Sequence, residues 1–424
     1  MAAPFQLGEV HYSAESAFAE NAEAASSNTY THRILTLGVP DHNPMQNRDP
    51  DGSIRSRMDE EGLPHIGVRE GEVSFTTYLV GHGGTAAGAL TETFQQDLIS
   101  DGLGGGNTAS VGTTISGAGS TATAINVTAG TTFSAGGACR IGVKGDARGD
   151  GQFLIIGTIT DASPDVLNLL TAAPAAPTTN GDVVYAVQVA YHDESAALAN
   201  TLGTKRFMVG HTTAGTPVHY MGCQLAGLKL EFPLEGGTSK PTVTYRYRAA
   251  YWDHANVTIP SSSPSASAAD CQPVSGGSMF INDVGTATRA TITPGRISLD
   301  LELGLEPIYG PGGNGTYQHI VGWQRTVCKP TLTVDLPWST ATTYKTWWDT
   351  ANSSIAYKHI LFTASAVNGR AVGFYMPRVM PYGNRPSRVI NVNGQQYATV
   401  QFRGVSGATT TSELTRSAIR ILAG

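Results

Sequence analysis

Several segments of the chain alternate apolar and polar residues, which is the pattern of a β-strand with one buried face. Within residues 296–306 the apolar positions are Ile297, Leu299, Leu301, Leu303 and Leu305. Residues 225–235 and 242–252 alternate in the same way, and a turn at Gly236 and Gly237 joins them into a hairpin. The pattern therefore predicts a mainly β fold, built from antiparallel sheets with one covered face.

Only two segments have the apolar spacing of a short amphipathic helix, residues 86–100 and 341–352. Each follows a strand-like stretch, residues 72–79 before the first and residues 331–338 before the second. This shared order of strand, short turn and helix is what an internal duplication would produce. No residue-level identity accompanies it, so one unit and two units both remain open.

Composition divides the chain further. Residues 104–134 are almost entirely Gly, Ala, Ser and Thr, and short strands separated by Gly and Pro follow them, so we expect an inserted small β domain at 108–190. A first unit would comprise residues 1–107 and 191–215, and a second unit residues 216–424 with a flexible loop at 259–269. We expect residues 38–66 to form a long polar loop with a role at an interface.

Charge and cysteine content exclude several classes of protein. The chain has 27 basic and 33 acidic residues, a net charge of −6, which excludes the basic surface of a protein that grips nucleic acid. Its four cysteines lie too far apart for a zinc site or a disulfide scaffold. The first residues lack the features of a signal peptide, and no stretch approaches 18 apolar residues. We expect a protein that is made in the cytoplasm and does not enter a membrane.

The sequence contains no recognisable catalytic motif. His-Glu-x-x-His, Gly-x-Ser-x-Gly and a Walker-type loop are all absent. Asp300 and Glu302 have the spacing of a glycosidase carboxylate pair, but nothing in the sequence places a cleft opposite them. Trp338, Trp347 and Trp348 could stack on sugars, although aromatic residues at this spacing more often belong to a core. We expect no enzymatic activity, no cofactor and no metal.

Two regions resemble the tail tube (major tail) proteins of long-tailed, non-contractile phages. The first is a long hairpin with a Gly-rich tip, Tyr220-Met-Gly-Cys-Gln-Leu-Ala-Gly-Leu-Lys-Leu-Glu-Phe-Pro-Leu-Glu-Gly-Gly followed by Thr242-Val-Thr-Tyr-Arg-Tyr-Arg-Ala. The second is the order of the closing strands, Lys358-His-Ile-Leu-Phe, Gly369-Arg-Ala-Val-Gly-Phe-Tyr-Met-Pro-Arg-Val and Asn393-Gly-Gln-Gln-Tyr-Ala-Thr-Val-Gln-Phe-Arg-Gly. The likeness is one of pattern and covers most of residues 66–100 and 190–424.

The resemblance implies tube domains of a β-sandwich or barrel type, with hairpins from six domains pairing edge to edge into a 24-stranded barrel. Rings would stack into the virion tail tube, through which DNA passes only as cargo. The ring would be a trimer if the chain is duplicated and a hexamer if it is not, with the inserted domain outside. Further partners would be the tape measure, tail terminator and distal tail proteins. Loop 38–66 and the tip at 236–240 are the expected contacts between rings.

On this interpretation the polar face of the tube strands lines the lumen, and its acidic members repel phosphate so that DNA slides. The expected lumen-facing residues are Lys229, Glu231, Arg246, Arg248, Ser298, Asp300, Glu302 and Glu306. The alternative function is a surface- or glycan-binding β-protein of the virion, a decoration or receptor-binding module. Lysine at Leu299 or Leu301 is expected to abolish ring formation by a tube subunit.

Overall fold

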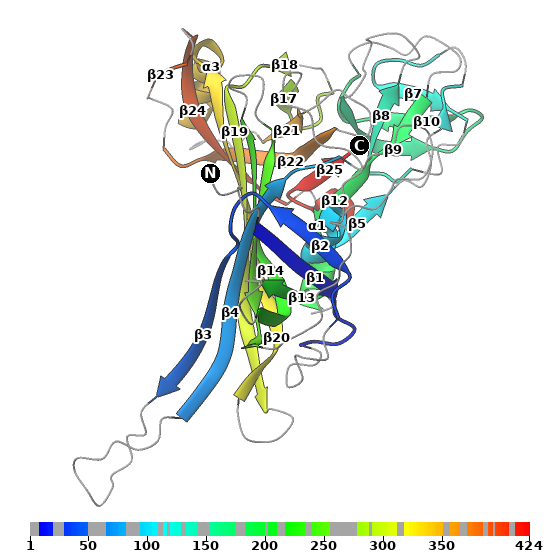
Figure 1. Cartoon of the computed structure of the whole chain (residues 1–424). Helices are drawn as coiled ribbons and strands as arrows, with labels where there is room; N and C mark the ends of the chain where they lie inside the picture. The colour runs from blue at the N-terminus through cyan, green and yellow to red at the C-terminus, as the bar shows by residue number, and fades with distance from the viewer. Residues whose placement is uncertain are drawn as a thin grey trace, which may run out of the picture.

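The computed structural model describes residues 8–19, 29–49, 65–81, 94–108, 113–116, 119–128, 133–142, 152–173, 183–199, 202–209, 217–233, 240–254, 278–287, 291–311, 318–350, 357–364, 371–384, 389–392, 395–406 and 412–424. The protein is mainly β (Figure 1), which confirms the fold class that the alternation predicted. None of the helices in this part of the chain has the length and apolarity needed to cross a membrane.

The elements up to residue 209 are β1 Gly8–Ala14, β2 His32–Thr36, β3 Asp41–Asp49, β4 His65–Tyr78, α1 Phe94–Leu103, β5 Gly104–Thr108, β6 Thr113–Thr114, β7 Ala124–Val127, β8 Ala138–Gly142, β9 Phe153–Thr160, β10 Asp165–Leu169, β11 Val183–Ala186, β12 Gln188–His192, α2 Glu194–Leu198 and β13 Lys205–Val209. Those after it are β14 Val218–Pro233, β15 Thr242–Ala249, β16 Tyr251–His254, β17 Ser278–Asp283, β18 Thr291–Ile292, β19 Arg296–Pro311, β20 Gln318–Pro337, α3 Trp338–Thr350, β21 Lys358–Thr363, β22 Val372–Tyr382, β23 Val389–Val392, β24 Gln395–Gly404, α4 Glu413–Arg416 and β25 Arg420–Ala423.

One antiparallel sheet, here called the central sheet, runs through the middle of the molecule. Its strands lie in the order β3, β4, β15, β14, β19, β20, β24. The end of β22 and then β23 occupy the eighth position, beside β24. The β3–β4 and β19–β20 hairpins extend from the body in the same direction (Figure 1).

The structure differs from the expected long polar loop at 38–66. Residues 41–49 are strand β3, paired with β4 along its length, while residues 50–64 lie outside the described residues. The segment shows no apolar alternation because β3 is the outermost strand of the central sheet, where Pro44 is also tolerated. The expected flexible loop at 259–269 and residues 236–239 of the expected tip also lie outside the described residues.

Apart from β6 to β11, the remaining strands form an outer layer against the apolar face of the central sheet. The first half of β14 pairs with β13 and β16 in this layer, and its second half pairs with β15 and β19 in the central sheet. The strand changes layer at Gly222, whose φ of 63° lies in the left-handed region. A Cβ here would lie 2.8 Å from the Cβ of Ala250, so the crossing requires glycine.

The core lies between the two layers. It contains Leu228 and Leu230 of β14 and Leu299 and Leu301 of β19, all buried. Helix α3 closes one end of the core, where Trp347 stacks on Phe402 with ring centroids 5.8 Å apart.

The chain is a tandem duplication of one topology. Both halves contain, in order, two short outer strands, a long hairpin, a helix, an outer strand, a strand that changes layer, its hairpin partner, and a short outer strand. The first half supplies β1, β2, β3–β4, α1, β13, β14, β15 and β16; the second supplies β17, β18, β19–β20, α3, β21, β22 with β23, β24 and β25. The pairings also match, because β4 pairs with β15 as β20 pairs with β24, and β1 pairs with β13 as β17 pairs with β21.

Details of the register support this equivalence. The β13–β14 pair has an irregularity after Lys205, and the β21–β22 pair has the same one after Lys358. The Thr76 and Thr244 hydroxyls are hydrogen-bonded at 2.8 Å, and at the equivalent place Thr399 donates to Asp335 at 2.6 Å. The repeat therefore divides the chain between β16 and β17, whereas the boundary expected at residue 216 falls between β13 and β14, which are hydrogen-bonded neighbours.

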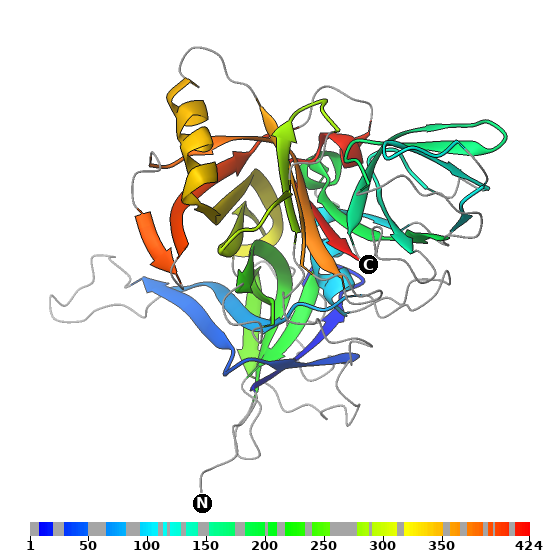
Figure 2. The ribbon, with the colours of Figure 1, turned by 90° about the horizontal axis from the view of Figure 1, so that it is seen from above.

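An insertion between α1 and β13 forms a separate small barrel. Strands β6, β11, β8, β9, β10 and β7 pair in that order, and a bridge from Val127 to Ile115 links β7 back to the β6 segment. The barrel has its own apolar core, which includes Ile125, Leu154 and Leu167. Figure 2 shows it at one side of the molecule, away from α3.

Candidate functional site: the polar face of the central sheet

The eight residues expected to line a lumen lie together on one face of the central sheet. They come from three adjacent strands, β15, β14 and β19, and none of the eight is buried. The register extends this face to both sides. Thr76, Thr244, Lys229, Asp300, Thr331 and Arg403 form one continuous row across six strands. The alternation in the sequence found the centre of the face but not its flanks.

Ion pairs within and between strands neutralise much of this face. Arg246 Nη2 lies 2.7 Å from Asp300 Oδ1, reaching over Gly227, which has no side chain to block it. Lys229 Nζ lies 2.7 Å from Glu231 Oε1, and Lys329 Nζ lies 4.0 Å from Glu302 Oε2.

Each exposed pair contributes little to stability. Their main effect is on the charge of the surface, because each carboxylate is paired with a cationic side chain. The face is thus polar and locally charge-balanced, where acidic repulsion had been expected. A cation already paired with a carboxylate is a poor phosphate ligand, so such a surface offers DNA little to bind.

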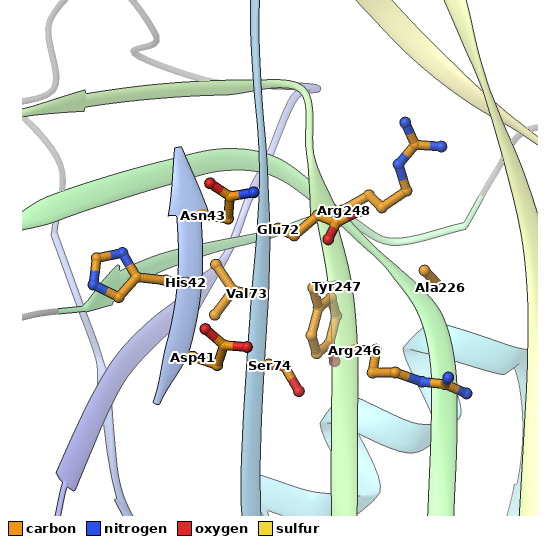
Figure 3. A pocket seen from close by; sticks show the side chains of 10 residues that line it. All are labelled: Asp41, His42, Asn43, Glu72, Val73, Ser74, Ala226, Arg246, Tyr247 and Arg248. Carbon is orange, nitrogen blue, oxygen red and sulfur yellow. The ribbon is translucent and has the colours of Figure 1, made fainter. Parts of the chain in front are cut away.

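A pocket of about 360 Å³ opens beside the β3 edge of this face (Figure 3). Asp41, His42 and Asn43 of β3 line it together with side chains of β4, β14 and β15. His42 Nδ1 lies 2.9 Å from the Tyr220 hydroxyl, and partial burial lowers the pKa of His42.

This pocket lacks the residue pairs of a nucleophilic hydrolase. Its lining residues include no serine–histidine or cysteine–histidine pair in hydrogen-bond contact. Throughout the described part of the chain, no group of three or more His, Cys, Asp or Glu side chains could hold a metal ion. The pocket lies beside β3, the outermost strand of the sheet. The far side of β3 has no partner strand among the described residues.

A second cavity, of about 650 Å³, lies between the small barrel and the outer layer and is lined mainly by apolar atoms. Arg420 lies in its wall, fully buried, and donates 2.7 and 3.2 Å hydrogen bonds to the carbonyls of Gly136 and Thr415. Its guanidinium lies 5.1 Å from the Tyr375 ring centroid. This arginine joins the C-terminal strand to the barrel.

None of the three tryptophans Trp338, Trp347 and Trp348 is fully exposed. Trp347 is buried against Phe402, and Trp338 packs partly buried against the same core. The carboxylates of Asp300 and Glu302 are engaged by Arg246 and Lys329 on an open sheet face. These positions give no support to a glycan-binding or glycosidase site at the residues considered from sequence.

No protein-family model matches the sequence, and a search of curated proteins finds no match.

Proposed function

We propose that the protein is a self-assembling structural subunit of a phage tail tube, in which the polar face of the central sheet lines the channel for DNA. The observation that carries this proposal is the tandem repeat that shares one continuous sheet with two free ends. Among the described residues β3 pairs only with β4, and β23 only with β24. Unpaired edges at both ends of a long sheet invite pairing with other chains, and closure into a barrel removes them.

The number of strands favours three chains per ring. The described residues supply eight strand positions to the central sheet, so three copies supply the 24 strands that the resemblance implies. At about 4.8 Å between strands, 24 strands span a circumference of at least ~115 Å, or a backbone diameter of at least ~37 Å. Charge-balanced polar side chains on the inner surface suit a conduit through which DNA slides.

The projecting hairpins suit contacts between stacked rings. The β19–β20 hairpin carries three exposed apolar side chains, Ile308, Tyr309 and Val321, beyond the body of the molecule. Apolar side chains grouped on a projecting arm are typical of a surface that another molecule covers.

Electron microscopy of the purified protein over a concentration series tests the proposal. We expect hollow rings or tubes with three-fold symmetry. Mass photometry at low concentration should find a species of about 133 kDa, three times the 44.4 kDa of one chain. Particles with no central channel at any concentration would reject the tube and redirect attention to a decoration or binding role. Rings of six chains would retain the tube and reject the count.

A further inference from the structure

The tandem repeat contains a junction between two units inside one chain, and this junction predicts the junction between chains. Inside the chain the units meet where β14 of the first half pairs with β19 of the second. In the repeat, β19 is equivalent to β3, and the second half of β14 is equivalent to the end of β22 together with β23. The free edges of the central sheet are therefore second copies of two strands that already pair with each other.

The register of the inner pairs fixes which residues are equivalent. The last residue of β4, Tyr78, lies opposite Thr242, and the last residue of β20, Pro337, lies opposite Tyr397. Matching these two pairs also superposes the Thr76–Thr244 and Asp335–Thr399 hydrogen bonds. Both long hairpins also contain an irregularity in their strand pairing, after Gln46 in β3–β4 and after Gly304 in β19–β20. The same alignment places these two irregularities within one residue of each other.

This alignment carries the internal junction onto the free edges. Asp41 faces Ser74 on β4 as Ser298 faces Thr333 on β20, so Asp41 is equivalent to Ser298. Ile390 faces Tyr397 on β24 as Glu231 faces Thr242 on β15, so Ile390 is equivalent to Glu231.

Glu231 and Ser298 lie directly opposite each other across the internal junction. Resting on the proposed tube function, we propose that β23 pairs antiparallel with β3 of a second copy of this chain, with Ile390 opposite Asp41 of the neighbouring copy.

Exposure of the residues leading into β3 agrees with this junction. Val39, two residues before the start of β3, is 86% exposed, and Leu37, directly after the end of β2, is 38% exposed. In the proposed register Val39 lies opposite Val392, since the equivalent positions in the internal junction are Arg296 and Pro233. Pairing with a neighbour would remove Val39 from water, and valine is well suited to a cross-strand contact.

Cysteine cross-linking tests the junction at the level of single residues. Directly opposed residues in an antiparallel pair have Cα atoms about 4.5–5.5 Å apart, within the range of a disulfide. The variant with Asp41→Cys and Ile390→Cys should therefore form disulfides in assembled protein under mild oxidation. The two positions lie at opposite ends of the sheet, about 34 Å apart across seven strand spacings, so the bond must join two chains. Non-reducing electrophoresis should show covalent dimers and trimers and stop at trimers.

A matched control uses the same two edges in the wrong register. Tyr382 also lies beside β24, and its equivalent in the first half is Gly227. Gly227 faces Glu302 across the internal junction, and Glu302 is equivalent to Met45. In the proposed register Tyr382 therefore lies opposite Met45 and not opposite Asp41. Asp41→Cys combined with Tyr382→Cys places the thiols four residues out of step, about 13 Å apart, and should give at least tenfold less cross-linking. Equal or preferential cross-linking of this control would overturn the register.

The outcomes separate the junction from the function. Rings or tubes in the microscope without cross-linking at Asp41 and Ile390 would overturn the β3–β23 junction and leave the tube proposal standing. Cross-linking that extends beyond trimers into an open ladder would reject the closed three-chain ring while retaining the junction. Absence of both rings and cross-links would reject the junction and the tube together.

Discussion

Leu299→Lys is expected to unfold the protein and not merely to prevent its assembly. Leu299 is 1% exposed and lies between Leu230 on β14 and Leu332 on β20. Removing a buried leucine from such a row costs about 2–5 kcal/mol, and a buried ammonium group without a partner adds several kcal/mol more. The sum is comparable to the whole stability of an ordinary domain, about 5–15 kcal/mol.

Ser298→Lys is the matched control, because Ser298 precedes Leu299 on the same strand and faces the opposite side. Its new ammonium group would lie beside Glu231 on the polar face, so the free energy of unfolding should change by no more than about 0.5 kcal/mol. Urea unfolding followed by circular dichroism measures both variants. A folded Leu299→Lys protein that fails only to assemble would show that the apolar face contacts another subunit.

This expectation changes how assembly has to be tested. Period-two alternation identifies the apolar face of a strand but not what covers that face. From the sequence, lysine at Leu299 or Leu301 is expected to abolish ring formation. In the structure they pack against the outer layer of their own chain, so lysine at either position tests the fold. The positions that bear on assembly lie at the edges of the sheet.

The strands predicted well are those with one solvent-exposed face and one buried face. β15 and β19 follow their apolar alternation closely, because every second side chain enters the core. β3 escaped prediction because an outermost strand has no such constraint, and its sequence, Asp-His-Asn-Pro-Met-Gln-Asn-Arg-Asp, reads as a polar loop. Its signal was of another kind, since polar residues with an internal proline are typical of an edge strand.

The duplication was visible only as a shared order of strand and helix. Equivalent core positions hold different apolar residues, such as Tyr247 and Phe402, because a core tolerates exchanges that keep volume and pattern. The layer change of β14 also has no periodic signal, since a single glycine at position 222 allows it. The charge balance of the polar face could not be derived either, because Arg246 meets Asp300 two strands away, across β14.

Acidification from pH 7 to pH 4.5 is expected to destabilise the protein through the half-buried His192 and the buried His359. Burial lowers the pKa of His192 to about 4, with the charge of Arg325 nearby acting in the same direction. Burial also lowers the pKa of His359 to about 4, although the Thr286 carbonyl, 3.2 Å from Nε2, opposes this shift. The unfolded chain takes up these protons near pH 6.5, whereas the folded chain resists them until about pH 4. Stability is therefore fully present above pH 6.5 and falls by about 2–3 kcal/mol per histidine by pH 4.5.

Glu15 has the opposite effect on stability, and it offsets part of the loss that the two histidines cause on acidification. Burial raises its pKa to about 7, so the folded state holds this proton more tightly than the unfolded state does. Its contribution is present at low pH and lost as pH rises from about 4.5 to 7, which returns about 2–3 kcal/mol on acidification. The three groups together predict a net loss of about 2–3 kcal/mol between pH 7 and pH 4.5, measurable by urea unfolding at several pH values. Replacing both histidines, His192→Gln and His359→Gln, removes the destabilising pair and leaves Glu15, so the slope should reverse. An unchanged slope in that variant would assign the acid sensitivity to other groups.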